Sequence, residues 1–338
     1  MTYTDEAFTE EQGILRESVR KLLRREADPW LALCGQIGVA ALGIPEKYGG
    51  LEAGMTEIQL VSEELGRVLA GVPFLGSAVL TTRALLESQD DEACVRLLPL
   101  LAEGAVGALA WWETDIRVSA GSQLDGRAPY VLAGDTASVL LVTAGTGLFE
   151  VDVEQNGVQR RPMPTMDETR RLATIELTGA RARRIGSGDF RPALSRIRDT
   201  ACAVLAAEQA GAAARALEIT VEFCKQRHQF GRPIGGFQAV KHRLAELYVL
   251  VETARSAAYA GAGSPRLAAV AKAYCSEAFH TVAAEMIQLH GGIAITWEHE
   301  AHRFFKRAHG TAQLFGQPHE HLPRITGDDV INTTIYPS

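Results

Sequence analysis

The chain has 338 residues, more than one small core usually organises, so two or three packed units are expected. Apolar residues make up 46% and charged residues 22%, which is ordinary for a globular protein and argues against extended disorder. The formal net charge of −7 argues against a general nucleic-acid binder, which needs a basic face.

Membrane and metal signals are weak in this sequence. No run of about 18 apolar residues predicts a membrane span, and the acidic, polar start MTYTDEAFTEEQ is unlike a secretory signal. The five cysteines lack metal-ligand spacing, so we expect reduced, buried thiols in a cytoplasmic protein. The late histidines, His299 and His302 among them, do not form a metal-ligand pattern, and no metal site is predicted.

The first hundred residues are expected to form helices. Thr9, followed by Glu10, Glu11 and Gln12, is typical of a helix start, and apolar residues then recur at helical spacing. After a Gly/Pro break at GIPEKYGGLEAG, three further helices are predicted at about 56–69, 73–87 and 91–102.

The pattern changes near Gly104, where short apolar runs rich in Val, Thr and Leu alternate with Gly and Asp. Strands are predicted at 106–112, 130–133, 138–143, 148–153 and 173–177, which indicates a small β domain of sandwich or barrel type.

The last part is helical again, with long helices predicted at 201–225, 237–260 and 266–290. Three or four long helices favour a bundle. The sequence therefore predicts an α+β chain with an N-terminal helical domain over 1–103, a middle β domain over 104–190 and a C-terminal helical bundle over 191–338.

One motif joins the first two of these long helices. The stretch RHQFGRPIGGFQAVKH starts at Arg227, where a helix is expected to end, and passes through a Gly/Pro-rich turn into the next helix. An Arg beside a Gly-rich turn could hold a phosphate through paired hydrogen bonds. The same spacing also fits a helical hairpin with an ordinary surface Arg, and spacing alone leaves both interpretations open.

At this point the sequence resembles the acyl-CoA dehydrogenase family. The resemblance rests on the stretch above, on GIPEKYGGLEAG followed by EELGR, and on QLHGGIAITWEHEAHRFFKRA, and it covers most of the chain. It implies an N-terminal helical domain, a middle β domain and a C-terminal four-helix bundle.

The resemblance also implies FAD as cofactor, bound between domains and across a subunit interface. Matched residue by residue, Arg227 should meet the FAD pyrophosphate, with Gln229 in the same turn and Phe230 near the adenine half. A second segment should approach the same half through Gln288, Gly291 and Gly292, since glycines let backbone N–H groups come close to phosphate oxygens. In the family these residues serve the flavin of a neighbouring subunit.

The family removes a proton α to a thioester carbonyl with a carboxylate, while a hydride leaves for the flavin. The two positions where members carry this carboxylate match Phe315 and Ala201, neither of which can accept a proton. Glu208 is a weak candidate for a relocated base; the competing interpretation is an exposed or interface carboxylate.

The β domain departs from the family as well. The expected Gly-Ser-Asp stretch is absent, and only Trp111-Trp112-Glu113-Thr114-Asp115 stands in that region. Either Trp could stack near a ring or belong to the domain core.

The residues that would contact the FAD of a neighbouring subunit are thus present. Those that would contact a flavin and a substrate bound by this chain itself are missing. This pattern resembles the smaller, non-catalytic subunit of actinobacterial heterotetrameric acyl-CoA dehydrogenases that act on sterol side-chain CoA thioesters. It implies a second dehydrogenase-like subunit in an α2β2 assembly, an acyl-CoA substrate and an electron-transfer flavoprotein as acceptor. Two alternatives stay open: a self-sufficient homomeric dehydrogenase using Glu208 or another carboxylate, and a helical assembly protein that binds no flavin.

Overall fold

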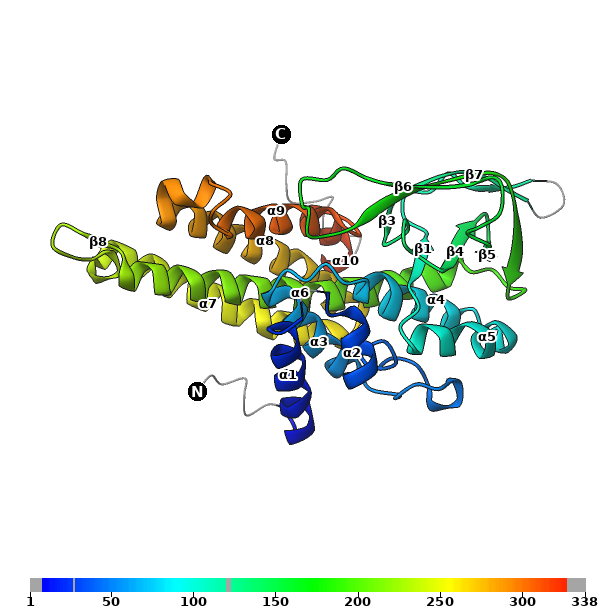
Figure 1. Ribbon diagram of the computed structural model, residues 1–338, viewed down its shortest axis with the longest axis horizontal. Helices are drawn as coiled ribbons and strands as arrows, with labels where there is room; N and C mark the ends of the chain where they lie inside the picture. Colours follow the sequence, from blue (N-terminus) through cyan, green and yellow to red (C-terminus); the bar gives the residue numbers. More distant parts are fainter. Residues whose placement is uncertain (1–7, 27, 120–122, 327–338) are drawn as a thin grey trace. The chain divides into compact units, whose positions relative to one another are not determined.

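A computed structural model describes residues 8–26, 28–119 and 123–326 (Figure 1). The described chain divides into two compact units. Unit 1 contains residues up to Val61 together with Gly71–Ala201, and unit 2 contains Ser62–Ala70 together with the chain from Cys202 onward. The predicted boundaries at 103/104 and 190/191 fall in the short connections that separate the helices from the strands.

Unit 1 begins with helices whose sequence signals are local. Thr9 accepts a hydrogen bond from the Gln12 amide while the Gln12 side chain accepts one from the Thr9 amide, so the predicted helix start is confirmed as a reciprocal cap. The predicted helix over 73–87 is also present, with a π-helical first half. The helices are α1 (Glu10–Leu23), α2 (Trp30–Ile37), η1 (Glu46–Tyr48), α3 (Met55–Arg67), η2 (Phe74–Thr81), α4 (Thr82–Glu87) and α5 (Asp91–Ala102).

The strands of unit 1 form one curled sheet. They are β1 (Gly107–Ala110), β2 (Arg117–Val118), β3 (Gln123–Leu132), β4 (Val139–Ala144), β5 (Gly147–Val151), β6 (Val158–Pro162) and β7 (Leu172–Ile185). Their order is β1-β4-β5-β7-β3-β2, with β6 also pairing β7. Among the strands that the structure describes in this sheet, β1 and β4 pair in parallel and the other pairs are antiparallel. Side chains from β1, β3, β4, β5 and β7 share one core, which confirms a half-barrel in the middle of the chain.

Unit 2 is built on four long helices, as predicted. Its elements are α6 (Arg191–Gln226, which starts in unit 1), β8 (His228–Gln229), β9 (Arg232–Pro233), η4 (Ile234–Gly236), α7 (Gln238–Ala260), η5 (Gly261–Gly263), α8 (Pro265–His290), η6 (Gly291–Ile295), α9 (Ala301–Gln313), η7 (Pro318–His321) and α10 (Leu322–Thr326). The α6 helix starts ten residues before the predicted Ala201, with Pro192 in its first turn, where a missing N–H costs no helical hydrogen bond.

The second half of α3 crosses α6 at backbone contact. A Cβ added at Gly66 would lie 2.0 Å from the Glu208 carbonyl oxygen, and one added at Gly211 would lie 2.0 Å from that of Glu63. Only glycine fits at either position, so the two helices approach more closely than side chains normally allow.

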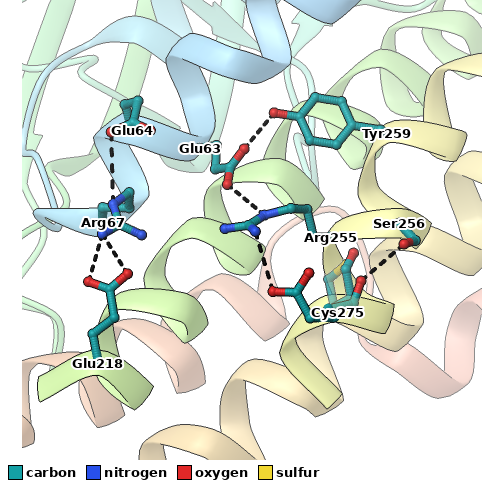
Figure 2. Close-up of polar contacts among 10 residues, drawn as sticks. Glu63, Glu64, Arg67, Glu218, Arg255, Ser256, Tyr259 and Cys275 are labelled. Atoms are coloured by element: carbon teal, nitrogen blue, oxygen red, sulfur yellow. Dashed lines mark hydrogen bonds and ion pairs between the residues drawn. The ribbon is translucent and has the colours of Figure 1, made fainter. Parts of the chain in front are cut away.

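Charged side chains fasten the same half of α3 to its neighbours (Figure 2). Glu63 accepts hydrogen bonds from the Nε of Arg255, at 2.9 Å, and from the Tyr259 hydroxyl, both on α7. Arg67 donates to both carboxylate oxygens of Glu218 on α6, at 2.7 and 2.8 Å. Because Glu63 is buried, its two partners offset the cost of desolvating the carboxylate.

Candidate functional site

The turn after α6 presents its side chains to solvent. The backbone N–H of Arg227 donates to the Phe223 carbonyl oxygen, and the Arg227 carbonyl accepts from the Ile234 N–H at 2.8 Å, which closes the turn around β8 and β9. Arg227 and Gln229 are exposed. Among the described residues, the Arg227 guanidinium has no hydrogen-bond or ion-pair partner.

Phe230 stands at the tip of this turn. Its backbone is left-handed, with φ of 54°, and its side chain is 92% exposed. The ring keeps an edge contact with Phe237 at 6.3 Å, and Arg232 lies 4.0 Å from the centre of the Phe237 ring. An exposed aromatic ring held by such contacts is a ready surface for another ring system.

The second predicted segment lies at the end of α8. Gln288 is exposed, and Gly291 ends the helix with φ of 67° and ψ of −145°, a conformation reserved for glycine. Gly292 follows with ordinary φ. A Cβ on either glycine would meet nothing within 4 Å. The packing of this chain therefore does not require glycine at 292, and the bare backbone there is open to a group from outside the chain.

A ring stack brings the two segments to one end of unit 2. Phe223, in the last turns of α6, stacks on His290 at the end of α8, with ring centres 4.2 Å apart and 28° between the planes. Figure 1 shows the β8 turn and the orange segment after α8 toward the same end of the bundle. Neither Phe223 nor His290 was assigned a role from the sequence, although His290 lies within the QLHGG motif.

Apolar side chains surround the same end. Trp297 is 70% exposed with the Lys306 ammonium 4.5 Å from its ring centre, and Ile295 is also exposed. An unpartnered guanidinium and an open glycine backbone are suited to bind a diphosphate. Exposed aromatic rings are suited to pack against an aromatic base. The residues present therefore fit the adenosine diphosphate half of a flavin cofactor.

The two positions matched to the family's base are buried and apolar. Phe315 is 3% exposed with φ of 61°, and Ala201 is fully buried. The loop that contains Phe315 is anchored by Lys272, whose ammonium donates to the carbonyl oxygens of Ala312 and Gly316, each at 3.1 Å. His321 lies 3.2 Å from the same Gly316 oxygen.

Glu208 lies in a buried ion pair with Arg307. The competing interpretation of an exposed carboxylate does not hold, because the Glu208 side chain is buried and accepts a hydrogen bond from Arg307 at 2.9 Å. Arg307 also donates to the carbonyl oxygens of Leu69 and Ala70, at 3.1 and 3.2 Å. Glu208 thus holds a guanidinium that satisfies the carbonyls after the C-terminus of α3.

Trp111 and Trp112 of unit 1 contact each other. The rings of Trp111 and Trp112 meet edge to face at 5.4 Å, and the Arg198 guanidinium lies 5.4 Å from the Trp112 ring centre. Both tryptophans are half-buried.

One pocket in unit 1 is lined by none of the predicted site residues. It has a volume of about 690 Å³ and lies where residues 87–91 meet residues 184–196. Its charged groups already have partners: Glu87 pairs with Arg83 and Arg196, and Asp90 accepts from the Ala93 and Gly186 N–H groups. The carboxylates of Glu87 and Asp90 are therefore already satisfied within the chain.

Across the residues that the structure describes, no three His, Cys, Asp or Glu side chains gather as a metal site would require. Over the same ranges, no helix is long and apolar enough to cross a membrane.

Comparison with known proteins shows which family profiles and relatives the chain matches. Residues 9–105 match the family profile described as the N-terminal domain of acyl-CoA dehydrogenase, and residues 198–322 match the C-terminal domain. "Acyl-CoA dehydrogenase IpdE2" of Mycolicibacterium smegmatis is 39% identical over 95% of this chain and 99% of that protein.

Two solved structures have the same fold over nearly all of the chain. The ChsE4–ChsE5 complex from Mycobacterium tuberculosis is 29% identical with a TM-score of 0.84, and the Tcur3481–Tcur3483 steroid ACAD is 28% identical with a TM-score of 0.82. Each comparison covers 94% of this chain and 96% of the other.

Proposed function

The chain belongs to the acyl-CoA dehydrogenase family of FAD-dependent oxidoreductases, and we propose that it works as one subunit of a heteromeric member. In this proposal it supplies FAD contacts across a subunit interface, and a partner subunit carries the catalytic base. The reaction is α,β-dehydrogenation of an acyl-CoA thioester. The observation that carries the proposal is the contrast between an open cofactor end and buried, apolar base positions.

FAD, when bound, accepts the hydride that leaves the β-carbon. In our proposal Arg227 donates paired hydrogen bonds to the FAD pyrophosphate. The backbone at Gly291 and Gly292 approaches the phosphate oxygens, while the Gly291 N–H itself donates to the Ile287 carbonyl oxygen. Gln229 and Gln288 add polar contacts, and Phe230 packs near the adenine half. Their exposure in the single chain supports a ligand that a second subunit helps to enclose.

The missing base supports a division of labour between subunits. A phenyl ring at 315 and a methyl group at 201 cannot remove a proton, and both are packed inside the chain. Glu208 is engaged with Arg307, so using it as a base would break a buried ion pair. We therefore assign the base to the partner.

The partner and the substrate are assigned by similarity. The two-component name of the ChsE4–ChsE5 complex supports a second dehydrogenase-like subunit in an α2β2 assembly. The steroid ACAD named above supports a sterol-derived CoA thioester as substrate. An electron-transfer flavoprotein is the acceptor we expect, and five free, buried cysteines support the expected cytoplasmic location.

The first test is a visible absorption spectrum of the chain purified alone and after co-expression with a second dehydrogenase-like subunit. A colourless chain and a yellow complex, with about one FAD per two chains, are expected from a shared site. A chain that is yellow alone and is reduced by an acyl-CoA would have its own base and would overturn the proposal.

A matched pair of variants tests the FAD contact itself. Arg227→Ala should lower the flavin content of the complex, because it removes a charge-assisted phosphate contact worth about 1.5–3 kcal/mol. The control is Arg266→Ala, an exposed arginine in the first turn of α8. Equal flavin content in the two variants would contradict the assignment of Arg227.

A further inference from the structure

His290 lies on a short path of contacts between the two cofactor segments. The Arg227 N–H bonds to the Phe223 carbonyl, the Phe223 ring stacks on His290, and Gly291 follows His290 in the chain. The His290 ring therefore contributes to the separation between the Arg227 turn and the open backbone at Gly291.

The ring is held in a defined state. Its Nδ1 lies 2.7 Å from the Met286 carbonyl oxygen, so Nδ1 carries the hydrogen and Nε2 keeps a bare lone pair. The side chain is 95% buried, as its exposed fraction is 5%, and Nε2 has no hydrogen-bond partner among the described residues. A proton on Nε2 would create a buried cation whose new N–H has no acceptor there.

The groups around the ring do not favour that cation. From α6 comes Phe223, which has no titratable group, and from the connection before α9 comes His299, with ring centres 4.5 Å apart. His299 uses its Nδ1 to accept the Ala301 N–H. The pKa of His290 is lowered, first by burial and further by His299, although the bond to the Met286 carbonyl opposes this.

We propose that His290 is a positioning residue for the cofactor: its neutral, stacked ring keeps the Arg227 turn and the Gly291–Gly292 backbone at the spacing that FAD requires, and protonation of the ring releases FAD. This inference rests on the proposed FAD contacts. Neither His290 nor the stack touches the reacting atoms, so its effect should appear in cofactor affinity rather than in the chemical step.

Protonation should weaken FAD binding in acid. The pKa of His290 is lowered from 6.5, so the ring is neutral above that pH. One proton that must leave before FAD binds changes the affinity about tenfold per pH unit below the pKa of the free site. FAD affinity should therefore be constant above pH 6.5 and fall only once the pH drops below the lowered pKa of His290.

The experiment measures the dissociation constant of FAD from the co-expressed complex by flavin fluorescence, between pH 8 and pH 5. His290→Phe keeps a ring in the stack and cannot be protonated, so it should bind FAD nearly as tightly at pH 8 and lose the fall in acid. His290→Ala removes the stack and should bind FAD about three- to tenfold more weakly than the wild type at pH 8, with no further fall in acid. The control is His280→Phe, on the same helix ten residues earlier, where an exposed imidazole contacts Phe305 at 5.4 Å.

The outcomes distinguish an error in the role of His290 from an error in the proposed function. A His290→Phe complex that loses FAD in acid as the wild type does overturns the role of His290, even if His290→Ala fails to assemble. The same holds if His290→Ala keeps wild-type affinity while circular dichroism shows an intact helix content. A wild-type complex that binds no FAD at any pH refutes the proposed function instead.

Discussion

Substituting Gly211 by alanine should destabilise the protein, although alanine is the better helix former. Gly211 lies inside α6, so in a free helix the change would stabilise by about 0.8–1 kcal/mol. At the crossing with α3, however, the new Cβ would stand 2.0 Å from the Glu63 carbonyl oxygen. Backbone atoms form that contact, and neither helix can turn a side chain away to relieve it.

The size of the effect follows from this overlap. Cβ atoms essentially never come within 3.0 Å of another heavy atom, so the helices must separate by about 1 Å at Gly211. Overpacking of this kind costs about 1–3 kcal/mol or more, which exceeds the gain in helix propensity. Separation would also stretch the hydrogen bonds that Glu63 accepts from Arg255 and Tyr259. We expect a net loss of about 1–2 kcal/mol.

Thermal unfolding followed by circular dichroism measures this loss as a midpoint lowered by several degrees. Gly13→Ala is the control, because Gly13 lies inside α1 and its Cβ would meet nothing within 4 Å; it should raise the midpoint. Gly66→Ala together with Gly211→Ala should cost less than the sum of the two, since both open the same crossing. A Gly211→Ala protein as stable as the wild type, or more so, would refute the close approach of α3 and α6.

Three further predictions concern charges and thiols. Glu208→Gln keeps an acceptor for Arg307 but removes the charge, so it should lower the free energy of unfolding by about 1–3 kcal/mol. Turnover of the complex should stay nearly intact. A roughly thousandfold loss of turnover would make Glu208 the base. Asp90→Ala should cost about 0.5–2 kcal/mol, because Asp90 caps α5. The Ala93 and Gly186 N–H groups lower the pKa of Asp90, so the folded state gains this stability above about pH 3.8 and loses it as the pH falls through the lowered pKa; a cost independent of pH between 2 and 6 would contradict that role. Burial raises the pKa of Cys34 to about 11 and that of Cys275 to about 12. A thiol reagent at pH 8 should therefore leave the native protein unmodified and label all five cysteines after unfolding. Rapid labelling of the native protein would show that the buried thiols are accessible.

The sequence predicted those elements of the fold whose signals are local. The α5 helix has the predicted bounds, Asp91–Ala102, and α8 starts one residue before its predicted start, because apolar periodicity and end signals agree there. Strands β2 and β6 were missed. The β6 strand reads VQRRP, which lacks an apolar face, and it forms because β7 offers it a free edge. Pairing with a distant strand leaves no periodic pattern to detect.

In the candidate site, too, the sequence predicted local motifs but not contacts between distant residues. Arg227 and Gly291 could be singled out because they lie in short motifs with recognisable turn chemistry. The stack of Phe223 on His290 joins residues 67 positions apart, and the ion pair of Glu208 with Arg307 joins residues 99 apart. Such contacts depend on how the helices cross, which neither composition nor spacing determines.

The open cofactor end has a consequence for how the chain is produced in a cell. Phe230, Ile295 and Trp297 are large apolar side chains that the isolated chain leaves in water at one end of unit 2. Exposed apolar surface of this kind promotes self-association until a cognate surface covers it. Synthesis without the second subunit should therefore lower the yield of soluble chain, and matched production of the two polypeptides should raise it.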